Sequence, residues 1–319
     1  MKRQLLATSV AGFSLFLAAQ AYSAGYYVDE QSALRLGDAF SGGAASASDA
    51  SAAYYGPASM VLVRDELVIN ASAISANSKF KGSAVTGTGN VSITGSTAKT
   101  ETTDLLPTLY FVKRLNEELV AGAYINAPFA TGVEFGKKSV ARYQAADSSI
   151  TGIDAGFSLA YQMTEALSVG GSFVLQYLEA TTGVAVNTSA VCLGANASGE
   201  LPFPCASLGL ADADLGTSTH DGYFEMKGHN LAAGFQLGAL YQFSQNSRLG
   251  FNYRSQIRHR LTGTATADFP ARAAGFTSLA GLDNIKAEGR VDMTTPEVVN
   301  LSYFHQLGDL ALQADLSYT

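Results

Sequence analysis

The residues best suited to catalysis or metal binding are few in this sequence and lie far apart. Its histidines are His220, His229, His259 and His305. None of them belongs to a recognisable nucleophile motif with a serine and an acidic residue. The two cysteines have no histidine nearby, and two thiols are too few ligands for a metal site. We therefore expect no catalytic residue, metal or cofactor, and the chain is not predicted to be an enzyme.

Cys192 and Cys205 are predicted to form a disulfide instead. They lie close together in the segment VCLGANASGELPFPC, and cysteines of exported chains meet an oxidising compartment. A disulfide that closes a loop of this length contributes about 3 kcal/mol in the chain-entropy model.

Residues 1–23 are predicted to be a secretory signal peptide. Lys2 and Arg3 precede an apolar stretch from Leu5 to Ala21, and small residues then fit cleavage after Ser23, with cleavage after Ala21 as the alternative. Loss of the two basic residues lowers the formal net charge from −7 to −9, which disfavours nucleic acid as a partner. No run of 18 apolar residues follows the leader, so transmembrane helices are not expected.

Alternating apolar and polar residues predict long β-strands after residue 100. Residues 231–243 place most apolar side chains at odd positions, and 249–261 repeat the pattern. Strands of ten or more residues suit the 9 to 11 that cross a bilayer. The predicted tight turns lie near 115–118, 164–166, 244–247 and 307–309, and the predicted long loops near 126–150, 180–222 and 262–290.

The alternation of tight turns and long loops, together with only 15% charged residues, predicts an all-β outer-membrane barrel that is polar inside and apolar outside. A soluble β-sandwich is the alternative, but its strands would be shorter and its outer face charged. Residues 48–60, SDASAAYYGPASM, do not fit a strand, because they are small and are interrupted by Gly56 and Pro57. Residues 24–64 precede the barrel, as a plug in its lumen or as a flexible tail.

The stretch QSALRLGDAFSGGAASASDASAAYYGPASM closely resembles the N-terminal hatch of FadL-type outer-membrane transporters of long-chain fatty acids, a family that includes toluene and xylene channels. The likeness continues in order along the chain. The further segments are LLPTLYFVKRL, APFATGVEF, ARYQAADSSI, GFSLAYQM, LGFNYRSQIRHRLTG and TPEVVNLSYFHQLGDLALQADLSYT.

The resemblance implies an antiparallel transmembrane barrel of 14 strands, with residues 24–64 as a hatch in its lumen. We count about nine strands within 65–319 and expect a C-terminally truncated part of such a barrel. The implied function is outer-membrane transport of long-chain fatty acids or similar hydrophobic molecules by a monomer in contact with outer-membrane lipid and lipopolysaccharide. The alternatives are a channel for neutral aromatic or aliphatic hydrocarbons and, less favoured, a general porin.

The resemblance also assigns roles within the hatch and the wall. Ala24, Gly25 and Tyr26 match the hatch N-terminus, which contributes to the ligand pocket. Gly56, Pro57 and Ala58 match the hatch turn, where the family usually has Asn before the proline. Pro128 and Phe129 lie in the segment that matches a kinked strand with a lateral opening. Proline cannot donate a ladder hydrogen bond, so an interruption is also expected on chemical grounds; an ordinary loop proline is the alternative.

Two further groups of residues are candidates for ligand contact. Leu201 and Phe203 would form the lip of an outer groove, or would pack their loop against itself. Arg254, Arg258 and Arg260 fall on the polar, lumenal face of the pattern. They are candidates to hold a substrate carboxylate, and the alternative is that they form internal salt bridges supporting the wall.

Overall fold

The computed structural model describes residues 27–86, 91–199, 201, 204–210, 214–279 and 285–319. The predicted signal peptide lies outside the described residues. So do Ala24, Gly25 and Tyr26 of the predicted hatch N-terminus, and Phe203 of the predicted groove.

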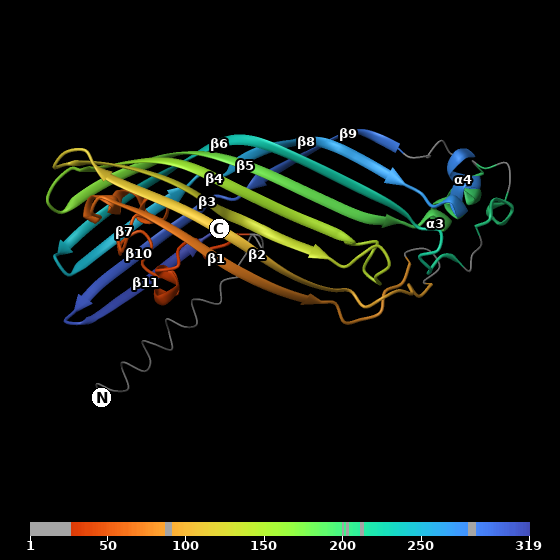
Figure 1. Cartoon of the computed structure of the whole chain (residues 1–319), viewed down its shortest axis with the longest axis horizontal. Helices are drawn as coiled ribbons and strands as arrows, with labels where there is room; N and C mark the ends of the chain where they lie inside the picture. Colours follow the sequence, from red (N-terminus) through yellow and green to blue (C-terminus); the bar gives the residue numbers. More distant parts are fainter. Residues whose placement is uncertain (1–26, 87–90, 200, 202–203, 211–213, 280–284) are drawn as a thin grey trace, which may run out of the picture.

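Eleven antiparallel strands form a single curved sheet, rolled into an open half-barrel (Figure 1). The strands are β1 (Glu66–Lys79), β2 (Lys99–Arg114), β3 (Leu119–Glu134), β4 (Asp147–Gln162), β5 (Leu167–Val186), β6 (Gly222–Ser244), β7 (Ser247–Arg254), β8 (Ile257–Asp268), β9 (Ile285–Thr295), β10 (Val298–Leu307) and β11 (Leu310–Tyr318). Pairing runs in order from β1 to β7 and continues through β10 to β11, while β8 pairs with β6 and β9. No helix within the described ranges is long and apolar enough to span a membrane.

All four predicted tight turns are confirmed, since they separate β2 from β3, β4 from β5, β6 from β7 and β10 from β11. We call the end of the sheet with these turns the turn end and the opposite end the loop end. The long connections are shorter than predicted, because several strands continue into them, as β5 does to Val186. The structure has eleven strands where about nine were counted, partly because 249–261 is divided into β7 and β8.

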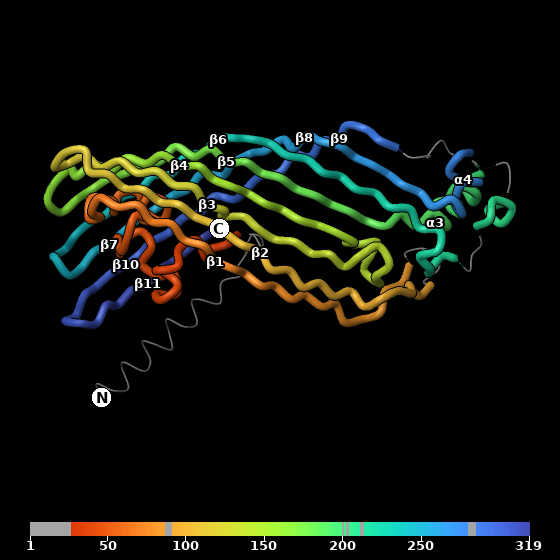
Figure 2. The backbone as a smooth tube through the Cα atoms, in the orientation of Figure 1, coloured from red at the N-terminus to blue at the C-terminus, as the bar shows by residue number. Residues whose placement is uncertain are grey.

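The hatch occupies the concave face of the sheet at the turn end (Figure 2). Its short helices are η1 (Arg35–Asp38), α2 (Ala52–Tyr55) and η2 (Pro57–Leu62). Every residue from 49 to 61 is buried. Ala53, Tyr54 and Met60 form the main apolar cluster together with wall residues such as Tyr110 and Tyr124. The described part of the hatch is therefore packed into the half-barrel and is not a free tail.

Glycines on the inner face of the wall explain why the hatch is built from small residues. Gly170 on β5 and Gly238 on β6 are cross-strand partners. A Cβ added at Gly170 would lie 2.5 Å from the Ala58 backbone nitrogen, and one at Gly238 would lie 3.1 Å from the same atom. On β7, a Cβ at Gly250 would meet the Ala44 carbonyl oxygen at 2.2 Å. The hatch backbone thus lies directly against the wall backbone, which only glycine in the wall permits.

The hatch turn follows from the same close approach. Gly56 joins α2 to η2, and a Cβ there would lie 2.6 Å from the Ala44 Cα atom. Pro57 begins η2, a first-turn position where its missing N–H is not needed. The Ser59 hydroxyl donates a hydrogen bond to the Gly56 carbonyl oxygen at 2.8 Å, so a side chain closes the turn even though no Asn precedes the proline.

Gly170→Val should disrupt the packing of the hatch against the wall, because a side chain at this position collides with the backbone around Ala58. Gly171→Val is the matched control, since its Cβ would have its nearest neighbour at 3.4 Å. We expect amide hydrogen exchange across residues 49–61 to accelerate at least about tenfold in the first variant, equivalent to about 1.4 kcal/mol. Equal exchange in the two variants, measured by mass spectrometry in detergent, would refute the glycine argument.

Candidate functional site

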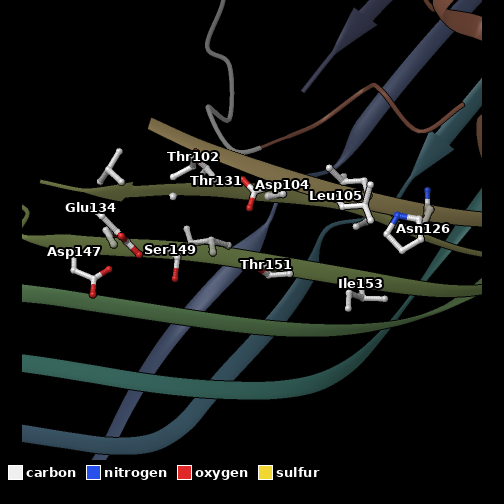
Figure 3. A pocket seen from close by; sticks show the side chains of 18 of the residues that line it. Thr102, Asp104, Leu105, Asn126, Thr131, Glu134, Asp147, Ser149, Thr151 and Ile153 are labelled. Atoms are coloured by element: carbon white, nitrogen blue, oxygen red, sulfur yellow. The ribbon is translucent and has the colours of Figure 1, made fainter. Parts of the chain in front are cut away.

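The wall has a window between β2 and β3. These strands pair only from Leu109–Ile125 to Arg114–Val120, although both continue toward the loop end. Beyond the Leu109–Ile125 pair a cavity of about 410 Å³ separates them, lined by residues of β2, β3 and β4 (Figure 3). Nearer the loop end, the Glu134 backbone N–H donates a hydrogen bond across the gap to the Thr100 hydroxyl, at 3.1 Å.

A one-residue bulge in β3 lies at the border of the window that is nearer the turn end. Asn126 pairs with Asp154 and Phe129 pairs with Gly152, so β3 advances three residues while β4 advances two. Side chains of a strand point alternately to its two faces. The extra residue therefore reverses which residues of β3 point inward and which point outward beyond the bulge. Phe129 consequently points inward and is fully buried. The strand remains continuous as β3 through Pro128, so the irregularity at this proline is a bulge within a strand.

The N-terminal part of the hatch docks on this bulge. The Val28 N–H donates to the Pro128 carbonyl oxygen at 2.9 Å. Tyr27 forms an isolated bridge with Phe129, and their ring centroids are 5.6 Å apart. Phe129 and the proline are thus contact points between the hatch and the edge of the window.

A second cavity, of about 350 Å³, lies on the inner face of the sheet toward the loop end. Its lining is Ser148, Ile150, Ala180, Thr182, Phe224, Met226, Gly228, Leu261, Val291 and Met293. None of these residues is charged, and most are apolar, as in binding sites for hydrophobic small molecules. Ser148 and Ile150 of β4 also line the window, so the inner cavity and the window are adjacent.

A buried polar layer lies between this cavity and the packed part of the hatch, residues 49–61. The Arg254 guanidinium is 2.6 Å from the Asp154 carboxylate, and both side chains are at most 2% exposed. The other oxygen of that carboxylate accepts a hydrogen bond from Gln176 at 2.7 Å. The side-chain amide oxygen of Gln176, Oε1, lies 2.9 Å from the His259 Nε2 atom and accepts a hydrogen bond from the Thr295 hydroxyl, also at 2.9 Å.

The order along β4 shows how these layers are stacked. Ser148 and Ile150 line the cavity, and Asp154 belongs to the polar layer. Ser158 donates to the Ala53 carbonyl oxygen of the hatch at 2.9 Å. From the loop end to the turn end along β4, the half-barrel therefore contains an apolar cavity, a buried ion pair and the packed part of the hatch around Ala53, while the N-terminal part of the hatch reaches past the ion pair to the bulge.

Arg254 lies on the inner face as predicted from the alternation, but the prediction for Arg258 and Arg260 is wrong. The chain changes register between β7 and β8, where Ser255 makes two hydrogen bonds with the Phe235 backbone. His259, not its neighbours, therefore points inward, and both of those arginines are exposed on the outer face. Arg260 forms an exposed ion pair with Asp292 at 3.0 Å.

The loop end carries a small cap of helices: α3 (Thr188–Ala197), η3 (Cys205–Leu208), η5 (Ala271–Ala273) and α4 (Ala274–Leu279). A disulfide joins Cys192 of α3 to Cys205 of η3, and both cysteines pack against Phe276 in a buried cluster. Leu201 packs against this cluster while remaining partly exposed. The disulfide thus ties the cap together, and the role of Leu201 in a groove stays a prediction.

Arg142 organises the loops and was not identified from the sequence. Its guanidinium is fully buried and binds the Asp221 carboxylate at 2.6 Å. It also donates to the carbonyl oxygens of Thr94, at 2.8 Å, and Gly216, at 3.2 Å. Thr94 lies in the β1–β2 loop, and Gly216 and Asp221 lie in the β5–β6 loop, whereas Arg142 itself is in the β3–β4 loop. Arg142 therefore connects three loops that are distant in sequence, and no local pattern around it could have signalled its partners.

Arg254→Met should destabilise the protein strongly, because it leaves the Asp154 carboxylate buried without a charge partner. We expect a loss of about 3–5 kcal/mol in the free energy of unfolding, and partial recovery in the double variant with Asp154→Leu. Arg260→Met is the control, since its exposed ion pair should contribute less than about 1 kcal/mol. The measurement is urea unfolding in lipid vesicles, and equal losses in the two single variants would contradict the assignment.

Comparison with known proteins places this arrangement among outer membrane transporters. The family described as "Outer membrane protein transport protein (OMPP1/FadL/TodX)" matches residues 14–319. A long-chain fatty acid transport protein of Escherichia coli O6:H1 is 25% identical over 326 residues, covering 99% of this chain and 69% of that protein. The chain spans about two thirds of the length of such curated relatives.

Solved structures of similar fold include those of two bacterial proteins. A Pseudomonas aeruginosa FadL homologue superposes with a TM-score of 0.74 at 23% identity, covering 92% of this chain and 69% of its own. The Pseudomonas putida toluene transporter TodX superposes with a TM-score of 0.55 at 20% identity, covering 84% and 64%.

Proposed function

The chain belongs to the family of outer membrane transport proteins described as OMPP1/FadL/TodX, and from this membership we propose that it transports hydrophobic molecules across the outer membrane. Long-chain fatty acids and similar acyl compounds are the first candidates. The name of the Escherichia coli relative, a long-chain fatty acid transport protein, supports this choice.

The observation that carries the proposal is the adjacency of the inner cavity and the window. An uncharged cavity of about 350 Å³ shares Ser148 and Ile150 with an opening in the wall of about 410 Å³. A hydrophobic molecule could leave such a cavity sideways, into the hydrocarbon layer, without entering water. Toward the turn end, the described residues place the buried ion pair and residues 49–61 of the hatch in the way.

The proposed order of steps follows the layers of the half-barrel. Ligand is captured near the cap at the loop end, where Leu201 lies, and passes into the inner cavity. Movement of the hatch N-terminus then releases the window between β2 and β3, and the ligand leaves laterally. In this proposal the loop end faces outward, the leader is cleaved during export, and the protein works as a monomer surrounded by lipid and lipopolysaccharide.

Neutral hydrocarbons are the second candidate class, and the lining of the cavity favours them. No lining residue carries a charge, and the guanidinium of Arg254 is already paired with a carboxylate. We infer that recognition acts through apolar bulk and not through a carboxylate-binding cation. A general porin is disfavoured, because such a channel needs an open aqueous lumen, whereas residues 49–61 are buried against the wall.

Comparing oleate with its methyl ester tests this proposal. We expect the purified protein in detergent to bind both with dissociation constants within about threefold of each other, because the cavity offers the carboxylate no partner. Binding of the acid at least tenfold tighter, about 1.4 kcal/mol, would contradict recognition by apolar bulk. It would indicate that a cationic side chain binds the carboxylate. Binding of neither compound would reject the proposed function and favour the porin. Titration calorimetry provides the measurement.

A further inference from the structure

Ala127 in the β3 bulge has no partner in the strand ladders. The pairing of β3 with β4 passes from Asn126 directly to Phe129, and the pairing with β2 has already ended at Ile125. An unpaired peptide group in a membrane-spanning wall is costly, because hydrocarbon supplies no hydrogen bonds. Some other group must therefore satisfy the backbone at Ala127.

The side chain of Gln31 supplies that group. Its carbonyl oxygen accepts from the Ala127 N–H at 3.0 Å, and its amide nitrogen donates to the Ala127 carbonyl oxygen at 3.0 Å. This is the two-bond exchange that a residue in a neighbouring strand would make. A primary carboxamide can imitate it because it carries the donor and the acceptor of a peptide group.

The backbone of Gln31 is attached to the opposite side of the window. Its carbonyl oxygen accepts hydrogen bonds from the hydroxyls of Thr108, at 3.2 Å, and Tyr110, at 2.7 Å, both on β2. Its N–H donates to the Tyr55 hydroxyl at 3.2 Å within the hatch. One fully buried residue thus connects β2, β3 and the hatch at the place where the two strands separate.

We propose that Gln31 is the positioning residue that couples the hatch to the window. While the hatch is seated, its carboxamide takes the place of the missing strand partner and holds the inner side of the bulge closed. When the N-terminal segment withdraws, Ala127 loses both hydrogen bonds, and Thr108 and Tyr110 of β2 lose their connection to the bulge through Gln31. The edges of β2 and β3 at the window are then released together, while their ladder toward the turn end stays paired. The gating role rests on the proposed lateral transport, whereas the coupling itself is a property of the fold.

Gln31→Leu removes both hydrogen bonds to Ala127, and Gln31→Glu keeps the size and the acceptor but loses the donor. Gln236→Leu is the matched control, because its amide also links the hatch to the wall, donating to the Tyr54 carbonyl oxygen at 3.2 Å, but from β6. All variants would be prepared as the full chain in detergent.

Hydrogen exchange of the peptide covering residues 126–130 is the first readout, and it requires no ligand. We expect exchange there to accelerate about tenfold or more in Gln31→Leu and by a smaller factor in Gln31→Glu, while residues 49–61 keep their protection. The Gln236→Leu variant should exchange like the wild type at 126–130. Unchanged exchange in Gln31→Leu, an equal acceleration in Gln236→Leu, or loss of protection throughout 49–61 would overturn the coupling.

Release of prebound methyl oleate is the second readout. We expect Gln31→Leu to release it several-fold faster than the wild type and Gln236→Leu to release it at the wild-type rate. Equal release rates in all variants, together with the expected exchange result, would overturn the gating role. Failure of the wild type to bind the ester would instead reject the proposed function, and the exchange experiment would still decide the coupling.

Discussion

The structure depends on one extra residue in β3. Backbone groups that face hydrocarbon need partners within the protein, and a regular ladder between β2 and β3 would provide them. The bulge between Asn126 and Phe129 ends that regularity, leaves the two strands separated beyond Ile125 and turns Phe129 inward. The hatch must therefore reach this point, and the contacts of Val28 and Gln31 are the consequence of an opening in the wall.

The hatch can reach that point because its packed part is held elsewhere, by close backbone contacts in addition to the apolar cluster around Tyr54 and Met60. Glycines on β5, β6 and β7 bring the two backbones together, and wall hydroxyls such as Ser158 and Ser168 bind hatch carbonyl oxygens. This leaves a firmly packed part, residues 49–61, and a short N-terminal part that lies at the window. The proposed gating needs such a division, because the N-terminal part has to leave the edge of the wall while the packed part stays in place.

The sequence predicted what local chemistry determines. Alternation and tight turns were sufficient for most strands and the turn end, and the missing N–H of Pro128 indicated an irregular strand. The small residues before Gly56 excluded a strand there but left a plug and a flexible tail open, and only the family resemblance favoured the hatch. Positions that depend on register were not predictable in this way. The change at Ser255 moves Arg258 to the outer face and His259 to the inner face, although apolar residues alternate on both sides of it. Arg142 and Gln31 bind groups that are distant in sequence, so their roles appear only in the folded chain.

The arrangement of polarity along the half-barrel also supports the proposed lateral route. To pass straight toward the turn end, an apolar molecule would have to displace the ion pair of Arg254 and Asp154, whose two charges are buried and would lose their mutual compensation. It would then meet the packed hatch. Through the window it would meet mainly uncharged lining residues, and the hydrocarbon beyond them is a solvent in which it is already stable. The same buried pair that makes the lumen a poor aqueous pore therefore supports the proposal that ligand leaves through the side of the barrel.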